Sequence, residues 1–183
     1  MSFAPVERMQ IKNSIERVLH VPGNYSGGTL EMAMVFDCNL PEEYIKRIGK
    51  DMAALLKSHS EIFRNVRLNI ICWEEDEAFI KEVSSIPYLQ MGRCFDSYRC
   101  VKNAKRLEIL ACQLKKFYAR SKIIIFFTDG NYLVEDRISF KENMHPFLHR
   151  KLIVLRCDTD DKGQTGKISV YSGTELMKKL TDE

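Results

Sequence analysis

The chain has 183 residues, which is long enough for one domain with a substantial buried core. With 45% hydrophobic and 29% charged residues it has the composition of a globular protein, which excludes disordered and fibrous classes. The net charge of +3 is too small to indicate nucleic-acid binding from composition alone. No apolar run approaches the roughly 20 residues that span a bilayer, and the N-terminus lacks the apolar segment of a signal peptide. We therefore expect an intracellular, cytoplasmic protein.

The first half of the chain predicts a helix followed by a strand–helix–strand unit. Apolar residues at loosely helical spacing predict a helix from Pro5 to His20, and a loop rich in glycine follows it. We expect residues 1–29 to pack on the domain and residues 30–183 to form it. The next predicted elements are a strand at Leu30–Phe36, a helix from Pro41 to Ser58, a strand at Val66–Trp73 and a short antiparallel edge strand at Ala78–Val83.

The second half is organised around Ile123–Phe127, five apolar residues with no polar alternation. Such a run is typical of a strand that is covered on both faces. The other predicted elements are a long helix at Tyr98–Ala119, a turn and helix at Asn131–His149, strands at Lys151–Arg156 and Lys167–Tyr171, and a helix at Gly173–Leu180. This alternation predicts an α/β fold, a doubly wound three-layer sandwich whose mostly parallel central sheet has one antiparallel edge strand.

Polar residues follow two of the predicted buried strands. Asp37 comes directly after the first strand, and Thr128 and Asp129 end the strand at Ile123–Phe127. In an open α/β sheet, the carboxyl ends of the central strands line the ligand crevice. We therefore expect a partner-binding crevice that comprises Asp37, Asn39, Arg93, Thr128, Asp129 and Gly130.

The aspartate after the first strand and the Thr128-Asp129-Gly130 motif after a later one resemble the von Willebrand factor A domain, over roughly residues 30–182. In that family a D-x-S-x-S loop, a threonine and the aspartate of the T-D-G motif hold a magnesium ion that captures a partner's carboxylate. Magnesium takes oxygen ligands and keeps open positions, which suits that task. The resemblance implies a similar fold, a metal-ion-dependent adhesion site and a role as a non-enzymatic adaptor or scaffold that binds a protein partner.

The sequence departs from the family pattern at three ligand positions. Asn39 and Pro41 stand where the two serines are expected, and the region of Arg93 offers no threonine. A degenerate magnesium site would use Asp37, Asn39, Asp129 and Asp96. Two interpretations stay open. Either the carboxylates hold a metal, or they cap the local helix and turn. Where no metal binds, Arg93 could pair with the carboxylates and supply the positive charge of the ion.

Two other functions are weighed against the adaptor. The first is a magnesium-dependent phosphohydrolase resembling the haloacid dehalogenase superfamily, with Asp37 as nucleophile and with Thr128, Lys151, Asp160 and Asp161 in supporting roles. Its second aspartate is replaced by Asn39, which removes the general acid/base. The second is a binder of nucleic acid or of an acidic protein through a basic surface on the predicted long helix, although no aromatic platform interleaves its cations. That surface comprises Arg99, Lys102, Lys105, Arg106, Lys115 and Lys116.

Cysteine and histidine residues give no sign of a zinc site or of a hydrolase. The six cysteines and four histidines contain no C-x-x-C pair and no zinc-binding spacing. Cys38 follows Asp37 near a predicted helix N-terminus, where a thiol can be reactive, but no histidine can be assigned as its base. His145 and His149 lack the glutamate of an H-E-x-x-H motif, so we expect them at the surface or in packing.

Overall fold

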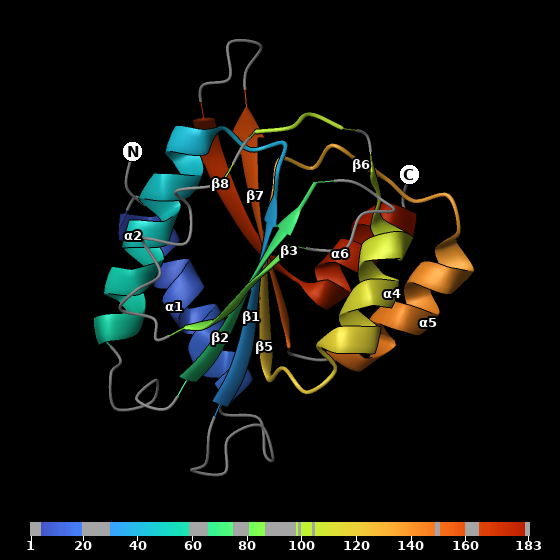
Figure 1. Ribbon diagram of the computed structural model, residues 1–183, viewed down its shortest axis with the longest axis horizontal. Helices are drawn as coiled ribbons and strands as arrows, with labels where there is room; N and C mark the ends of the chain where they lie inside the picture. The colour runs from blue at the N-terminus through green and yellow to red at the C-terminus, as the bar shows by residue number, and fades with distance from the viewer. Residues whose placement is uncertain are drawn as a thin grey trace.

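The computed structural model describes residues 5–19, 30–58, 66–74, 81–86, 98, 100–103, 105–148, 151–159 and 165–181. A six-stranded sheet lies between two layers of helices (Figure 1). Its strands are β1 (Leu30–Asp37), β2 (Val66–Trp73), β3 (Lys81–Ile86), β5 (Ile123–Thr128), β7 (Leu152–Thr159) and β8 (Thr165–Ser172). The helices are α1 (Pro5–Leu19) and α2 (Glu42–Ser58) on one face, and α4 (Leu107–Phe117), α5 (Arg137–Leu148) and α6 (Gly173–Thr181) on the other. The predicted α/β sandwich is confirmed.

The sheet has the strand order β3-β2-β1-β5-β7-β8. Its four central strands are parallel, and α2 provides the crossover from β1 to β2. The edge strand β3 pairs antiparallel with β2, as predicted for this edge, although the strand runs over Lys81–Ile86. The other edge strand, β8, also runs antiparallel, against β7. The structure thus adds a second antiparallel edge to the predicted one.

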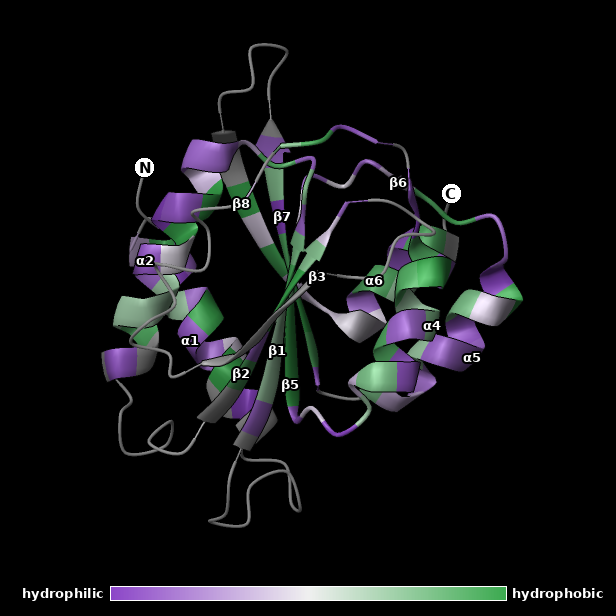
Figure 2. Ribbon diagram, in the orientation of Figure 1, coloured by the Kyte–Doolittle hydropathy of each residue, from purple (hydrophilic) through white to green (hydrophobic). Residues whose placement is uncertain are grey.

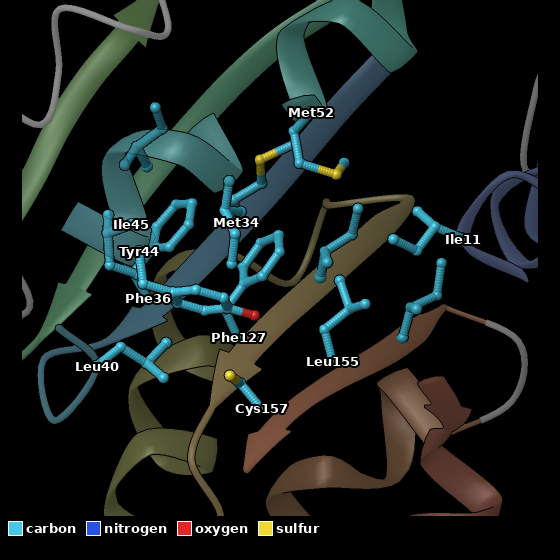
Figure 3. Close-up of a cluster of buried hydrophobic side chains, with 14 of the residues drawn as sticks. Ile11, Met34, Phe36, Leu40, Tyr44, Ile45, Met52, Phe127, Leu155 and Cys157 are labelled. Carbon is cyan, nitrogen blue, oxygen red and sulfur yellow. The ribbon is translucent and has the colours of Figure 1, made fainter. Parts of the chain in front are cut away.

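Side chains of the central strands alternate between two apolar cores, one under each helix layer. Ile123, Ile125 and Phe127 face α1 and α2, whereas Ile124 and Phe126 face the other layer. The strands are therefore apolar along most of their length (Figure 2). In the first core Phe36 stacks on Phe127 with ring centroids 4.6 Å apart (Figure 3). A strand buried on both faces needs the unbroken apolar run that β5 has.

Helices α1 and α2 close the first core with apolar residues at helical spacing. Ile45 and Met52 of α2 and Ile11 of α1 point into the same core on this face of the sheet (Figure 3). Glu42 begins α2 and pairs with Lys46 one turn later, at 3.0 Å.

Among the residues that the structure describes, no helix combines the length and apolarity needed to cross a membrane.

The predicted helix at Tyr98–Ala119 is wrong in its first part. Residues 101–103 are not helical, Lys105–Arg106 form the short strand β4, and α4 begins only at Leu107. Strand β4 pairs in parallel with β6 (Tyr132–Leu133), which the sequence placed in a turn and helix. The helix does not extend to Lys105 because this side chain is buried at the end of the sheet, where it pairs with Asp37. A lysine on the outward face of a helix could not reach that position.

Candidate functional site

The carboxyl ends of β1 and β5 lie side by side and bring Asp37 and Thr128 together. These parallel strands pair in register from Met32 to Phe36, so both end at the same edge of the sheet. The Thr128 hydroxyl Oγ1 donates a hydrogen bond of 2.8 Å to Asp37 Oδ2. Both side chains are fully buried. The arrangement places an acidic group inside the protein, where a charge needs a partner.

That partner is Lys105, which sequence reasoning had placed on an exposed helix face. Its ammonium Nζ lies 2.5 Å from Asp37 Oδ1 and 3.3 Å from Asn39 Oδ1, and its side chain is 0% exposed. The same nitrogen lies 4.9 Å from the centroid of the Trp73 ring. An ammonium has three donor hydrogens, and this environment offers a carboxylate, an amide oxygen and an aromatic face.

Asn39 connects this ion pair to two other segments. Its backbone N–H donates to Asp37 Oδ1 at 3.0 Å, the hydrogen bond of an Asx turn. Its side-chain Oδ1 accepts from the backbone N–H of Asn103 at 2.8 Å as well as from Lys105. Its Nδ2 donates to the carbonyl of Asn131 at 3.4 Å. Asn39 therefore acts as a structural link here, with its amide oxygen already bonded to two donors.

Residues 98 and 100–103 cover the ends of β1 and β2. The buried Tyr98 hydroxyl lies 2.7 Å from the carbonyl of Leu40 and 3.2 Å from that of Asp37. The backbone N–H of Val101 donates to the carbonyl of Cys38 at 2.8 Å, and Asn103 Nδ2 donates to the carbonyl of Glu74 at 3.1 Å. These contacts hold the segment against the strand ends and exclude solvent from the ion pair.

The electrostatics of the site are set by burial and by charge pairing. Burial raises the pKa of the Asp37 carboxyl above its usual range, and Lys105 opposes this shift, together with the hydrogen bonds from Asn39 and Thr128. Both carboxylate oxygens have donors within hydrogen-bond distance. The cluster therefore resembles a satisfied buried ion pair rather than a reactive carboxylate.

The predicted metal ligands come together only in part. Asp37 and Asn39 are neighbours, but Asp129 is partly exposed and its Oδ1 accepts from the backbone N–H of Asn131 at 2.9 Å, as the capping interpretation predicts. Asp96 and Arg93 lie outside the described residues. Within the described ranges, no three or more histidine, cysteine, aspartate or glutamate side chains are grouped to hold a metal. With an ammonium on both oxygen ligands, the described donor set does not fit magnesium.

Gly130 completes the turn after β5 in a conformation that favours glycine. Its φ of +81° is in the left-handed region, and its N–H donates to Thr128 Oγ1 at 3.0 Å. A Cβ at this position would lie 2.6 Å from Nε of Arg156, whose side chain crosses the turn from β7. Arg156 Nε also lies 3.6 Å from Asp158 Oδ1. The turn after β5 and the Arg156 side chain therefore lie against each other at the carboxyl edge of the sheet.

The predicted basic surface is wrong as a single face. Lys105 is buried in the ion pair, and Arg106 Nη1 lies 3.8 Å from the carboxylate of Glu135. Lys102 is exposed in the segment before β4, while Lys115 and Lys116 lie in the last turn of α4, at the other end of that helix. The remaining member, Arg99, lies outside the described residues.

The residues that a phosphohydrolase would need are not assembled. Lys151 directly precedes β7, so it lies at the amino edge of the sheet, opposite to Asp37. Asp160 and Asp161 lie outside the described residues. The Cys38 thiol is buried, and a hydrogen bond with Cys72 together with burial raises its pKa, which disfavours a reactive thiolate.

Sequence reasoning missed Lys105, Tyr98 and Asn103, all of which build the site. Their contacts join positions far apart in the chain, so the local spacing of residues does not predict that these side chains belong to the site. The apolar stripe Leu107, Leu110, Ala111 and Leu114 indicates α4, but Val101 and Ala104 continue the same spacing upstream, so the stripe does not show where the helix begins.

The fold and the site together define an α/β three-layer sandwich with a buried aspartate–lysine pair at the carboxyl edge of its sheet. Comparison with protein-family models, with curated proteins and with solved structures finds no significant match. The assignment of function therefore depends on the geometry of this chain.

Proposed function

We propose that this chain is a non-enzymatic protein-interaction module of the kind that the von Willebrand factor A resemblance implies, and that it binds its partner at the carboxyl edge of the sheet without a metal ion. One observation carries the proposal: the Lys105 ammonium lies between Asp37 and Asn39, where a bound cation would need their oxygens. A fixed internal cation makes the local charge balance independent of any ion from solution.

The same geometry disfavours the phosphohydrolase alternative. A nucleophilic carboxylate must reach the substrate phosphorus, but the Asp37 side chain is fully buried and both of its oxygens accept hydrogen bonds. Asn39 occupies the position of the general acid/base and is itself bonded to two donors. An enzyme using this site would have to dismantle the cluster before each turnover.

The surface beside the cluster offers apolar contacts for a protein partner. Leu133 of β6 is 50% exposed and Ile138, in the first turn of α5, is 73% exposed. Both belong to the part of the chain that follows the turn after β5. Exposed apolar side chains next to polar groups of a turn are the mixture that protein interfaces use.

A photo-crosslinking residue in place of Asn131 tests where the partner binds. Asn131 is exposed at the carboxyl edge, and an equivalent residue in place of Lys50, exposed on α2, provides the control position. We expect a crosslinked protein from position 131 and none from position 50. The identified protein is then expressed, and its affinity for the purified chain is measured with and without EDTA.

Matched substitutions then test the interface. Leu133→Glu and Ile138→Glu should each weaken the reconstituted complex about tenfold or more, as expected when a charge enters an apolar contact. Val6→Glu and Met9→Glu, which add the same charge to exposed apolar positions on α1, should leave the affinity unchanged. Loss of binding in EDTA, or equal losses in both pairs, contradicts the proposal. Phosphatase activity that disappears in Asp37→Asn would replace it with the enzymatic alternative.

A further inference from the structure

Basic residues gather at the amino edge of the sheet, opposite to the buried ion pair. They come from the end of α4, from the turn that leads into β5, and from the residue before β7. Figure 1 shows the α4–β5 turn at the lower end of the sheet. We call this group the amino-edge basic patch; it comprises Lys115, Lys116, Arg120, Lys122 and Lys151.

The strand pairing places two of these lysines next to each other. Strands β5 and β7 run parallel with Ile124 opposite Leu152, and the N–H of Ile124 donates to the carbonyl of Lys151 at 2.8 Å. Lys122 directly precedes β5, so Lys122 and Lys151 both stand at the start of adjacent strands. Burial lowers the pKa of Lys151, and the positive charge of Lys122 lowers it further. The two ammonium groups are therefore close enough to repel each other.

Among the residues that the structure describes, no ion pair neutralises the charge of the patch. Within the described part of the chain, none of its five cations forms an ion pair, whereas Lys46, Arg106 and Arg156 each have a carboxylate oxygen within 4.0 Å. Lys115 and Lys116 have a structural explanation, since cations stabilise the last turn of a helix. The same explanation does not apply to Arg120, Lys122 and Lys151, which lie outside α4.

An exposed aromatic ring lies beside one cation of this group. Phe117, the last residue of α4, is 52% exposed, and the ammonium of Lys116 lies 5.3 Å from the centroid of its ring. Cations that contact phosphates and an aromatic face that stacks on a base are the combination used by proteins that bind single-stranded nucleic acids. An acidic peptide would use the cations but would have no need of the ring.

We propose that the amino-edge basic patch binds single-stranded nucleic acid, with Phe117 stacking on a base and with Arg120, Lys122 and Lys151 contacting backbone phosphates. This site lies at the opposite end of the sheet from the proposed protein interface. The two functions are therefore independent, and each can be lost without the other.

Fluorescence anisotropy of a labelled oligothymidylate, titrated with the full chain over a series of salt concentrations, tests this site. Three phosphate contacts predict a slope of log K against log salt of about −2, at about 0.7 for each contact with a single strand. The double variant Lys122→Gln/Lys151→Gln should make that slope shallower by about 1.4. Phe117→Leu should weaken binding about 5- to 100-fold and leave the slope unchanged, because stacking releases no counterions.

The matched control is Arg47→Gln/Lys50→Gln, which removes the same charge from exposed positions on α2. It should bind the oligonucleotide like the unsubstituted chain, and thermal unfolding followed by circular dichroism should show that every variant is folded. No saturable binding at low salt overturns the proposal, as do equal losses in both double variants. Undiminished binding by Phe117→Leu, combined with full competition by polyglutamate, would show that the patch recognises an acidic protein instead.

Discussion

Replacement of Lys105 by methionine removes the cation from the buried cluster while keeping a side chain of similar length. Asp37 then stays fully buried with hydrogen bonds from the Asn39 N–H and the Thr128 hydroxyl, but without a counter-charge. Removing one partner of a buried pair in this way costs about 3–5 kcal/mol. For a chain of this length, we expect a loss on the order of 10 °C in the unfolding temperature.

A second substitution separates lost charge from lost packing. In the double variant Asp37→Asn/Lys105→Met, no charge remains in the cluster, and the asparagine keeps the size of the aspartate. We expect the double variant to be more stable than Lys105→Met alone, with a coupling free energy of about 2 kcal/mol in the double-mutant cycle. Urea unfolding of the four proteins, followed by circular dichroism, supplies the free energies of unfolding.

The pH dependence of Lys105→Met gives an independent measurement. Without the ammonium, the effect of burial on the Asp37 pKa is less opposed, so the folded-state pKa lies further above the unfolded one. The free-energy cost of burying the charged Asp37 carboxylate is then complete above the folded-state pKa and absent below the unfolded-state pKa. Stability of the variant should therefore rise relative to the unsubstituted chain as the pH falls through the folded-state pKa.

Two results would show that Asp37 and Lys105 do not stabilise the fold as a charged pair. If Lys105→Met loses less than about 1 kcal/mol at neutral pH, Asp37 and Lys105 do not form a buried pair of the kind described. If the variant is strongly destabilised but gains nothing at low pH, the loss comes from packing rather than from an uncompensated carboxylate.

Three further experiments examine the surroundings of the ion pair. Gly130→Ala should cost about 1–2 kcal/mol in urea unfolding, because its φ is +81° and its Cβ would contact Arg156. Thr128→Val removes the hydroxyl that donates to Asp37 and should cost about 1–3 kcal/mol in the same assay. Titration with Ellman's reagent, in a Cys94→Ser background, should label exposed thiols in the folded chain and buried thiols only after unfolding. The thiolate is the reactive form, and burial raises the pKa of the Cys157 thiol to about 11, which disfavours that form. The exposed thiols are Cys100 and Cys112, and the buried ones are Cys38, Cys72 and Cys157.

Most of the fold could be predicted because its signals are local. The unbroken apolar run Ile123–Phe127 and the helical stripe that starts after Pro41 report burial directly, and both elements are found where expected. The second antiparallel edge was missed because the ends of β7 and β8 carry polar residues such as Asp158 and Thr165. An edge strand with one face in solvent has this composition, which also suits a loop.

The site could be predicted only in outline. The rule that strand ends meet at one edge located Asp37 and Thr128, since it depends on topology alone. It did not locate Lys105, because lysine and arginine have good helix propensity and Lys105 and Arg106 directly precede a genuine helix. What overrides propensity here is a contact with Asp37, 68 residues away in the chain. The orientation of Asp129, which caps its own turn, is likewise decided by local hydrogen bonding.

A crystal structure grown in millimolar manganese, with anomalous data collected, tests most directly whether a lysine takes the place of a metal ion in this site. We expect no anomalous peak between Asp37 and Asn39, with the Lys105 ammonium still bonded to both side chains. An anomalous peak about 2.1 Å from the Asp37 carboxylate, with Lys105 displaced, would contradict this expectation and restore the metal-dependent interpretation.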